Sequence, residues 1–210
     1  MSEHQVTIDW KRETPDFAYG KGAGNLITSG GLADVNWTVT NENTGALQAA
    51  ETVYSNNADC YGGWAANGPN SDWIARNANV TNNGPAPYTF YRTFDLTGYN
   101  LSTVSISGAW TVDDAGTLSL NGITLATLGD GNWGSLASFS VPTGSSDFVQ
   151  GLNTLAITIT YDDEYLEGVR LQGTLVGTSA VPEPSTLIMS GTMTLIGLGY
   201  WWRRRRSATT

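Results

Sequence analysis

The segment LAITITY, residues 155–161, places a large apolar side chain at every second position. Leu155, Ile157 and Ile159 fall on one face of an extended chain, while small alanine and threonine side chains fall on the other. Alternation with a period of two is typical of a β-strand that buries one face and exposes the other. This stretch predicts a sheet that packs against an apolar core on one side only.

The same alternation recurs through the first 180 residues, and helical periodicity is nearly absent there. The apolar positions that share a face in this way are Val35, Trp37 and Val39; Tyr88, Phe90, Phe94 and Leu96; Val104, Ile106, Gly108, Trp110 and Val112; Phe139 and Val141; and Val169, Leu171, Gly173 and Leu175. Leu118 and Leu120 precede Asn121-Gly122, a pair that favours a type I′ hairpin turn. Eight or more short strands separated by Gly, Asn and Pro predict an all-β fold, an antiparallel β-sandwich or jelly roll.

The composition agrees with many short strands joined by turns. Only 14% of the 210 residues are charged, and 25 are glycine. The formal net charge of the whole chain is −9. The last thirty residues contain Glu183 and Arg203–Arg206, so residues 1–180 hold six basic and eighteen acidic residues, a charge of −12. Such an acidic body repels phosphate backbones, which argues against nucleic-acid binding. The single histidine, His4, and the single cysteine, Cys60, exclude a disulfide within the chain and a metal site built from several histidines.

The C-terminal region has a different character. Residues 186–202, TLIMSGTMTLIGLGYWW, contain no charge, and as a helix they would span about 25 Å. Trp201 and Trp202 close this span with rings that favour the membrane interface. A cluster of four arginines follows directly: Arg203, Arg204, Arg205 and Arg206. The pattern predicts one C-terminal transmembrane helix. Because arginine clusters stay on the cytoplasmic side, residues 1–180 are expected outside the membrane.

The order of these parts is more specific than any one of them. Pro182-Glu183-Pro184, then the apolar span, then the arginine cluster resembles the PEP-CTERM sorting signal of bacterial envelope proteins. The resemblance implies that a membrane-embedded exosortase recognises Pro182, Glu183 and Pro184 and processes the chain. It also implies a cell-envelope or extracellular location, with the C-terminal helix as an anchor before processing. Since residues 1–24 contain no apolar secretory segment, we expect one in frame upstream of Met1.

These observations divide the chain into four parts. An N-terminal segment with the first strand or strands covers residues 1–30, and a jelly-roll ectodomain covers residues 31–176. A proline-containing linker with the sorting motif covers residues 177–185. The transmembrane span and arginine cluster cover residues 186–206.

Part of the body resembles the galactose-binding-domain-like jelly roll. The resemblance lies in Tyr91-Arg92-Thr93-Phe94-Asp95-Leu96, then in Ile106-Ser107-Gly108-Ala109-Trp110, and then in Leu118-Ser119-Leu120-Asn121-Gly122. Similar strings occur in sugar-binding jelly rolls attached to glycoside hydrolases and in PEP-CTERM ectodomains. The resemblance implies the fold, and it does not transfer a ligand.

Acidic residues follow two of the expected strands. Asp113 and Asp114 end one strand, and Asp162, Asp163 and Glu164 follow another, with Glu167 close behind. If both loops lie at one end of the sandwich, their carboxylates have the chemistry to hold a structural Ca²⁺ ion. Two carboxylates are also the machinery of a glycosidase. The remaining interpretation is that they are solvated loop charges.

Tryptophans form the second set of candidates. Trp64, Trp73 and Trp133 fall in or near expected loops, and residues 54–87 are rich in Asn, Gly and Pro. Exposed indole faces stack on sugar rings, but tryptophan also closes the end of a sandwich core. The residues that we expect to contact a ligand, if the domain has one, are Trp64, Trp73, Asp113, Asp114, Trp133 and Asp163.

Three functions are compatible with these sequence features. The leading interpretation is an exported envelope protein without enzymatic activity, with a structural role in the extracellular polysaccharide matrix. The alternative is a glycan-binding module, with or without calcium, and a third is a carbohydrate-active enzyme. No organic cofactor is expected. The absence of a usable histidine and of a recognisable catalytic string argues against the enzyme.

Overall fold

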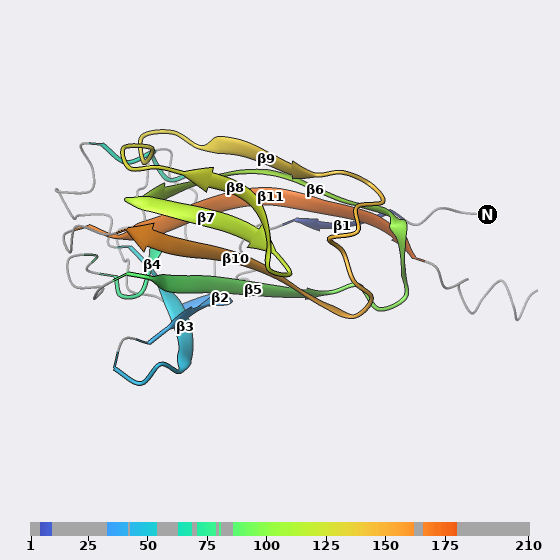
Figure 1. Ribbon diagram of the computed structural model, residues 1–210, viewed down its shortest axis with the longest axis horizontal. Coiled ribbons are helices and arrows are strands. Elements are labelled where there is room, and N and C mark those ends of the chain that lie inside the picture. The colour runs from blue at the N-terminus through green and yellow to red at the C-terminus, as the bar shows by residue number, and fades with distance from the viewer. Residues whose placement is uncertain are drawn as a thin grey trace, which may run out of the picture.

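The computed structural model describes residues 5–9, 33–41, 43–53, 63–68, 71–78, 80, 86–161 and 166–179. Every regular element within these ranges is a strand (Figure 1). The described residues include no helix long and apolar enough to cross a membrane.

The expected C-terminal sorting signal lies outside the described residues. This holds for the whole of the motif, the apolar span of residues 186–202 and the arginine cluster. The transmembrane helix and its topology therefore stay predictions. The residues concerned are Pro182, Glu183, Pro184, Trp201, Trp202, Arg203, Arg204, Arg205 and Arg206.

Eleven strands are present in the described ranges: β1 (Gln5–Asp9), β2 (Ala33–Thr40), β3 (Leu47–Thr52), β4 (Ile74–Ala75), β5 (Tyr88–Asp95), β6 (Tyr99–Asp113), β7 (Ala115–Leu120), β8 (Ile123–Leu128), β9 (Ala137–Val141), β10 (Leu152–Tyr161) and β11 (Gly168–Ser179). They pair in the order β8-β7-β10-β5-β2-β3-β4-β11-β6-β9, with β1 also on β11. Each of these pairings is antiparallel. The all-β antiparallel prediction is therefore confirmed for these residues.

The strands form two layers with one apolar core between them. In Figure 1, β7, β10 and β5 lie in front, and β6 and β11 lie behind them. Phe90, Leu118 and Ile157 of the front layer and Ile106 and Leu175 of the back layer belong to one buried cluster. Each fully buried side chain of this kind stabilises the fold by about 1.5–3 kcal/mol. These residues are members of the predicted alternating sets, so the inward faces of the strands match the sequence pattern.

The turn between β7 and β8 is the two-residue hairpin that the sequence predicts. Leu120 pairs with Ile123, so Asn121 and Gly122 alone form the connection. Both central residues have positive φ, 51° at Asn121 and 83° at Gly122, as a type I′ turn requires. The Asn121 amide also donates to the Thr154 carbonyl oxygen at 2.8 Å. This contact fixes the hairpin turn against the start of β10.

Candidate functional site

Two of the tryptophans expected in loops pack on each other. The Trp64 and Trp73 rings stack with centroids 4.0 Å apart and planes 28° apart. Trp64 Nε1 donates to Asp113 Oδ2 at 2.5 Å, and Trp73 Nε1 donates to the Ala65 carbonyl oxygen at 2.7 Å. Trp73 is only 3% exposed, so its ring faces are covered by protein. The polar edge of each indole is thus already satisfied within the domain.

Trp133 joins the same cluster from the loop after β8. Its carbonyl oxygen accepts a hydrogen bond from the Ala65 amide at 2.8 Å, and its half-buried ring packs against the group that contains Trp73. Asp113 and Asp114 are both buried beside this region, at the end of β6. The structure therefore brings most of the expected residues together at one end of the sandwich. Asp163 lies outside the described residues, and a ligand contact by this group stays a prediction.

A buried arginine anchors the loop that carries Trp64. Arg170 on β11 donates from Nε to Ser71 Oγ at 3.0 Å, and from Nη1 to the carbonyl oxygens of Ala65 and Ala66. Burial lowers the pKa of the Arg170 guanidinium, and the negative charge of Asp72 opposes that shift. Because charge-assisted hydrogen bonds are strong where water is excluded, this end of the domain is a tightly held structural unit.

The expected calcium site depends on residues beyond those that the structure describes. Among the described residues, no group of three His, Cys, Asp or Glu side chains is close enough to hold a metal ion. Residues 162–165, which carry three of the expected acidic ligands, are outside the described ranges. Calcium binding by the two acidic loops stays a prediction.

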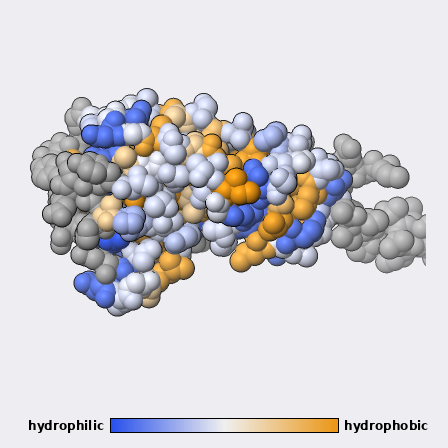
Figure 2. Space-filling view, viewed as in Figure 1, coloured by the Kyte–Doolittle hydropathy of each residue, from blue (hydrophilic) through white to orange (hydrophobic). Residues whose placement is uncertain are grey.

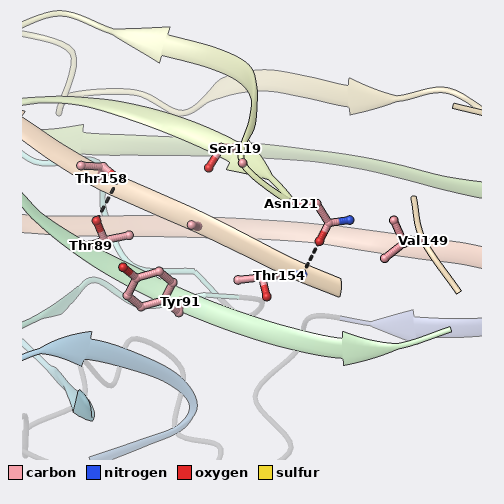
Figure 3. A pocket seen from close by; sticks show the side chains of 9 residues that line it. Thr89, Tyr91, Ser119, Asn121, Val149, Thr154 and Thr158 are labelled. Carbon is pink, nitrogen blue, oxygen red and sulfur yellow. Dashed lines mark hydrogen bonds between the residues drawn. The ribbon is translucent and has the colours of Figure 1, made fainter. Parts of the chain in front are cut away.

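A groove lies elsewhere, on the outward face of the front layer. It has a volume of about 500 Å³ and is lined by Thr89, Tyr91, Ser119, Asn121, Gly122, Val149, Thr154, Ala156 and Thr158. Figure 3 shows most of these side chains over β5, β10 and β7, with Val149 beyond the start of β10. Figure 2 shows pale residues of intermediate hydropathy on this face, with apolar residues gathered toward its right-hand end. The volume is within the range of about 300–1,000 Å³ that is usual for small-molecule sites.

A row of threonines crosses the strands, and two of its members, Thr89 and Thr158, line the groove. Thr158 lies opposite both Thr89 and Thr117, and Thr117 lies opposite Thr127, so four strands contribute one threonine each. The hydroxyls of Thr89 and Thr158 are hydrogen-bonded to each other at 2.9 Å (Figure 3). Neighbouring strands are about 4.8 Å apart, so the row presents methyl and hydroxyl groups at regular intervals.

The middle of the groove owes its depth to a small residue. Ala156 lies opposite Tyr91 on one side and Ser119 on the other. Because alanine ends at Cβ, the floor is low between two larger neighbours. Tyr91 is half-buried and is the single aromatic residue among those that line the groove in the described chain. Its ring stands at the β5 side of this floor (Figure 3).

A network of hydrogen bonds fixes the far end of the groove. The buried Asn153 side chain donates to the carbonyl oxygens of Val149 and Gly151 at 2.8 Å each. Its Oδ1 accepts from the Val149 amide at 3.0 Å and from Asn121 Nδ2 at 2.8 Å. Asn121 Nδ2 also donates to the Asp147 carbonyl oxygen at 2.7 Å. Val149 is thereby placed as an end wall, and 44% of its surface is exposed.

Sequence reasoning located the strands of this groove but not the groove. Tyr91 and Ala156 stand out on outward positions where threonine is the commoner neighbour, and this is the signal that the sequence contains. This signal alone does not predict the groove, because the sequence does not show which strands are neighbours. In the sheet β10 lies between β5 and β7, and both are distant from β10 in the chain.

Comparison with known proteins gives similarities of fold. No model of a known protein family matches the chain, and no curated protein matches it. Similar solved structures include the CBM36-1 carbohydrate-binding domain of a multidomain xylanase from the hindgut metagenome of Trinervitermes trinervoides (16% identity, TM-score 0.31, 70% of this chain and 100% of that chain). A family 35 carbohydrate-binding module from an environmental isolate is similar at 13% identity and TM-score 0.34, over 69% of this chain and 98% of that chain. The Stig cyclase Fisc from Fischerella sp. TAU is similar at 12% identity and TM-score 0.41, over 84% and 100%. At these values the similarities say nothing about a ligand of this chain.

Proposed function

We propose that this protein is a non-enzymatic glycan-binding protein and that the groove over β5, β10 and β7 is its binding surface. The proposal depends on one observation: an open groove on a sheet face combines a tyrosine ring with a set of outward hydroxyl groups. Sugar rings have apolar C–H faces and hydroxyls that both donate and accept. A half-buried tyrosine covers the first kind of surface, and Ser and Thr hydroxyls pair with the second.

The chemistry of the lining favours binding without turnover. Glycoside hydrolysis needs a pair of carboxyl groups that flank the bond to be broken. Among the described residues, those that line the groove include no carboxylate, imidazole or thiol. Six of the nine lining residues stand on the paired strands β5, β7 and β10, and hydrogen bonds of Asn121 and Asn153 hold the turn and the loop that supply the others. Such a surface is held in place before a ligand arrives, so binding requires little ordering of the protein.

A retention experiment with matched threonines tests this proposal. The full 210-residue chain, kept in solution with an uncharged non-glycosidic detergent, is run through gels that contain soluble polysaccharides. Tyr91→Ala should weaken retention about tenfold, since an aromatic contact contributes up to about 1.5 kcal/mol. Thr89→Val should weaken it less, because it removes one hydroxyl.

Thr93→Val is the matched control, because Thr93 is an outward threonine on the same strand that does not line the groove. Its retention should equal that of the wild type. Equal retention of Tyr91→Ala and the wild type would contradict the proposal, provided that the melting temperature of the variant is unchanged.

We further propose that the protein is exported and processed through its C-terminal region. The observation that favours this is the order of Pro182-Glu183-Pro184, the apolar residues 186–202 and Arg203–Arg206. Export would also serve the proposed binding function: a single groove of this kind binds weakly, and many copies at a cell surface would supply avidity. Mass spectrometry of the protein from its native host should show loss of the tail beyond the motif. Intact arginines on all surface material would refute the sorting proposal.

A further inference from the structure

We infer that the groove selects uncharged glycan chains and excludes acidic ones such as uronate-containing or sulfated polysaccharides. This inference rests on the proposed glycan-binding function and names the ligand class of the same site. It depends on three properties of the described residues: the charge of the lining, the hydrogen-bonding groups that remain available there, and the placement of the basic residues.

The described residues that line the groove carry no positive charge to pair with an anion. All nine residues that line the groove are uncharged, and in the described chain none is Lys, Arg or His. Proteins bind carboxylate and sulfate mainly through guanidinium and ammonium groups, because these give strong charge-assisted hydrogen bonds. A ligand carboxylate moved into this groove would lose its water and gain no opposite charge, which is unfavourable.

Among the described residues that line the groove, Asn121 alone has a side-chain amide, and that amide has no donor left for a ligand. Asn121 Nδ2 has two hydrogens, and it donates one to Asp147 O and the other to Asn153 Oδ1. Its Oδ1 accepts from the Thr154 amide at 2.9 Å. The ligand therefore meets a surface of hydroxyl groups rather than a cluster of N–H donors.

Hydroxyl groups suit an alcohol better than an anion. Each hydroxyl donates once and accepts through its lone pairs, as a sugar hydroxyl does. In the Thr89–Thr158 pair one donor is already used between the two oxygens, which are 2.9 Å apart. The pair thus offers one donor and several acceptor positions to a ligand. An ionised carboxylate or sulfate only accepts, so it can use the one remaining donor and leaves the acceptor positions of the pair unused.

The basic residues of the described chain are kept away from the surface. They are Arg76, Arg92 and Arg170, and their exposed fractions are 6%, 9% and 5%. Arg92 alternates with Tyr91 along β5 and so points to the opposite face of the strand. Arg76 lies over the Tyr88 ring, 3.7 Å from its centroid. With a formal charge of −12 on residues 1–180, the field around the domain repels polyanions at low salt.

Matched polysaccharides test the inference on the full chain. A microarray of neutral and acidic polysaccharides is probed at low and at physiological salt; it includes hydroxyethylcellulose with carboxymethylcellulose, and dextran with dextran sulfate. We expect binding to neutral members only, at least tenfold stronger than to the acidic member of the same pair, and insensitive to salt. Tyr91→Ala should abolish most of this signal.

A charge introduced into the groove should reverse the selection. Ser119→Lys places a cation beside Ala156 and should create binding to acidic polymers at low salt that fades at physiological salt. Ser140→Lys is the matched control, because Ser140 is an exposed serine on β9 of the other layer. It carries the same charge change and should create no such binding.

The outcomes separate the two proposals. If no polysaccharide is bound, or if binding survives Tyr91→Ala, the glycan-binding function of the groove is wrong. If acidic polymers bind the wild type as strongly as neutral ones and both signals are lost in Tyr91→Ala, the groove binds glycans but does not select against charge. Binding of acidic polymers by Ser140→Lys to the same extent as by Ser119→Lys would also overturn the selection by the groove.

Discussion

Replacing Asn153 by alanine tests whether the end wall of the groove is part of the structural core of the domain. Asn153 has no exposed surface, and its side chain makes four hydrogen bonds. Two of these bonds hold the amide and the carbonyl oxygen of Val149, and a third holds the carbonyl oxygen of Gly151. Alanine would remove all four bonds and leave those backbone groups to find water.

The structure sets the expected size of the effect. A neutral hydrogen bond contributes about 1 kcal/mol net, which puts the four bonds at about 4 kcal/mol. The loop lies at the surface, so water recovers part of this, and we expect a loss of about 3 kcal/mol in the free energy of unfolding. For a domain of this size that corresponds to a fall of about 6–12 °C in melting temperature.

The assay is thermal unfolding of the full chain, followed by far-ultraviolet circular dichroism. Gln150→Ala is the control, because Gln150 lies in the same loop but is exposed and makes a single bond, to the Tyr99 carbonyl oxygen at 2.8 Å. A surface change of this kind should alter stability by no more than about 0.5 kcal/mol. If Asn153→Ala melts within about 2 °C of the wild type, the network does not hold the loop in place and the expected role of Asn153 is wrong.

Three further predictions concern the tryptophan cluster, the hairpin turn and an exposed carboxylate. Trp73→Ala should lower the free energy of unfolding by about 3–5 kcal/mol in urea denaturation, because the ring is buried; an unchanged midpoint would show that it is not part of the core. Gly122→Ala should cost about 1–2 kcal/mol because φ is 83°, although nothing lies within 4 Å of the added Cβ; Gly129→Ala, also free of contacts but with no positive φ, should be close to neutral. Hydrogen bonds from the Thr97 hydroxyl, and to a smaller extent from the Thr97 backbone amide, lower the pKa of the Asp95 carboxyl. Proline has neither donor, so Thr97→Pro should raise that pKa toward 3.8 in an NMR titration; no upward change would contradict the contact.

The inward half of the fold could be predicted from the sequence, because burial of one face leaves a period of two over much of the longer strands. β10 and β6 show this most clearly, and the Asn121-Gly122 turn has its own local signal. β3 could not be recognised in the same way, since LQAAET has one large apolar residue and is held in the sheet by its neighbours β2 and β4.

The candidate site was harder to predict, because a loop tryptophan that binds sugar and one that closes a core have the same local sequence. Only the packing decides between them. The Trp73 ring is covered, and its Nε1 donates to the Ala65 carbonyl oxygen. Both features depend on a loop that folds back on itself, which the local sequence does not show. The groove likewise depends on three strands that are neighbours in space and not in sequence.

Under the proposed function, the two faces of the front layer have different roles, the inward face in stability and the outward face in binding. Ile157 points into the core with no exposed surface, so its truncation would leave a cavity and cost several kcal/mol. Its neighbours Ala156 and Thr158 line the outward groove and are not members of the main buried cluster, so replacing them should affect folding less than replacing Ile157. Since side chains alternate along a strand, ligand preference can change at positions such as Tyr91 and Ser119 while the inward residues remain fixed. A library that varies the lining of the groove should therefore yield folded proteins with different polysaccharide preferences, whereas the same library shifted by one residue along each strand should yield unfolded ones.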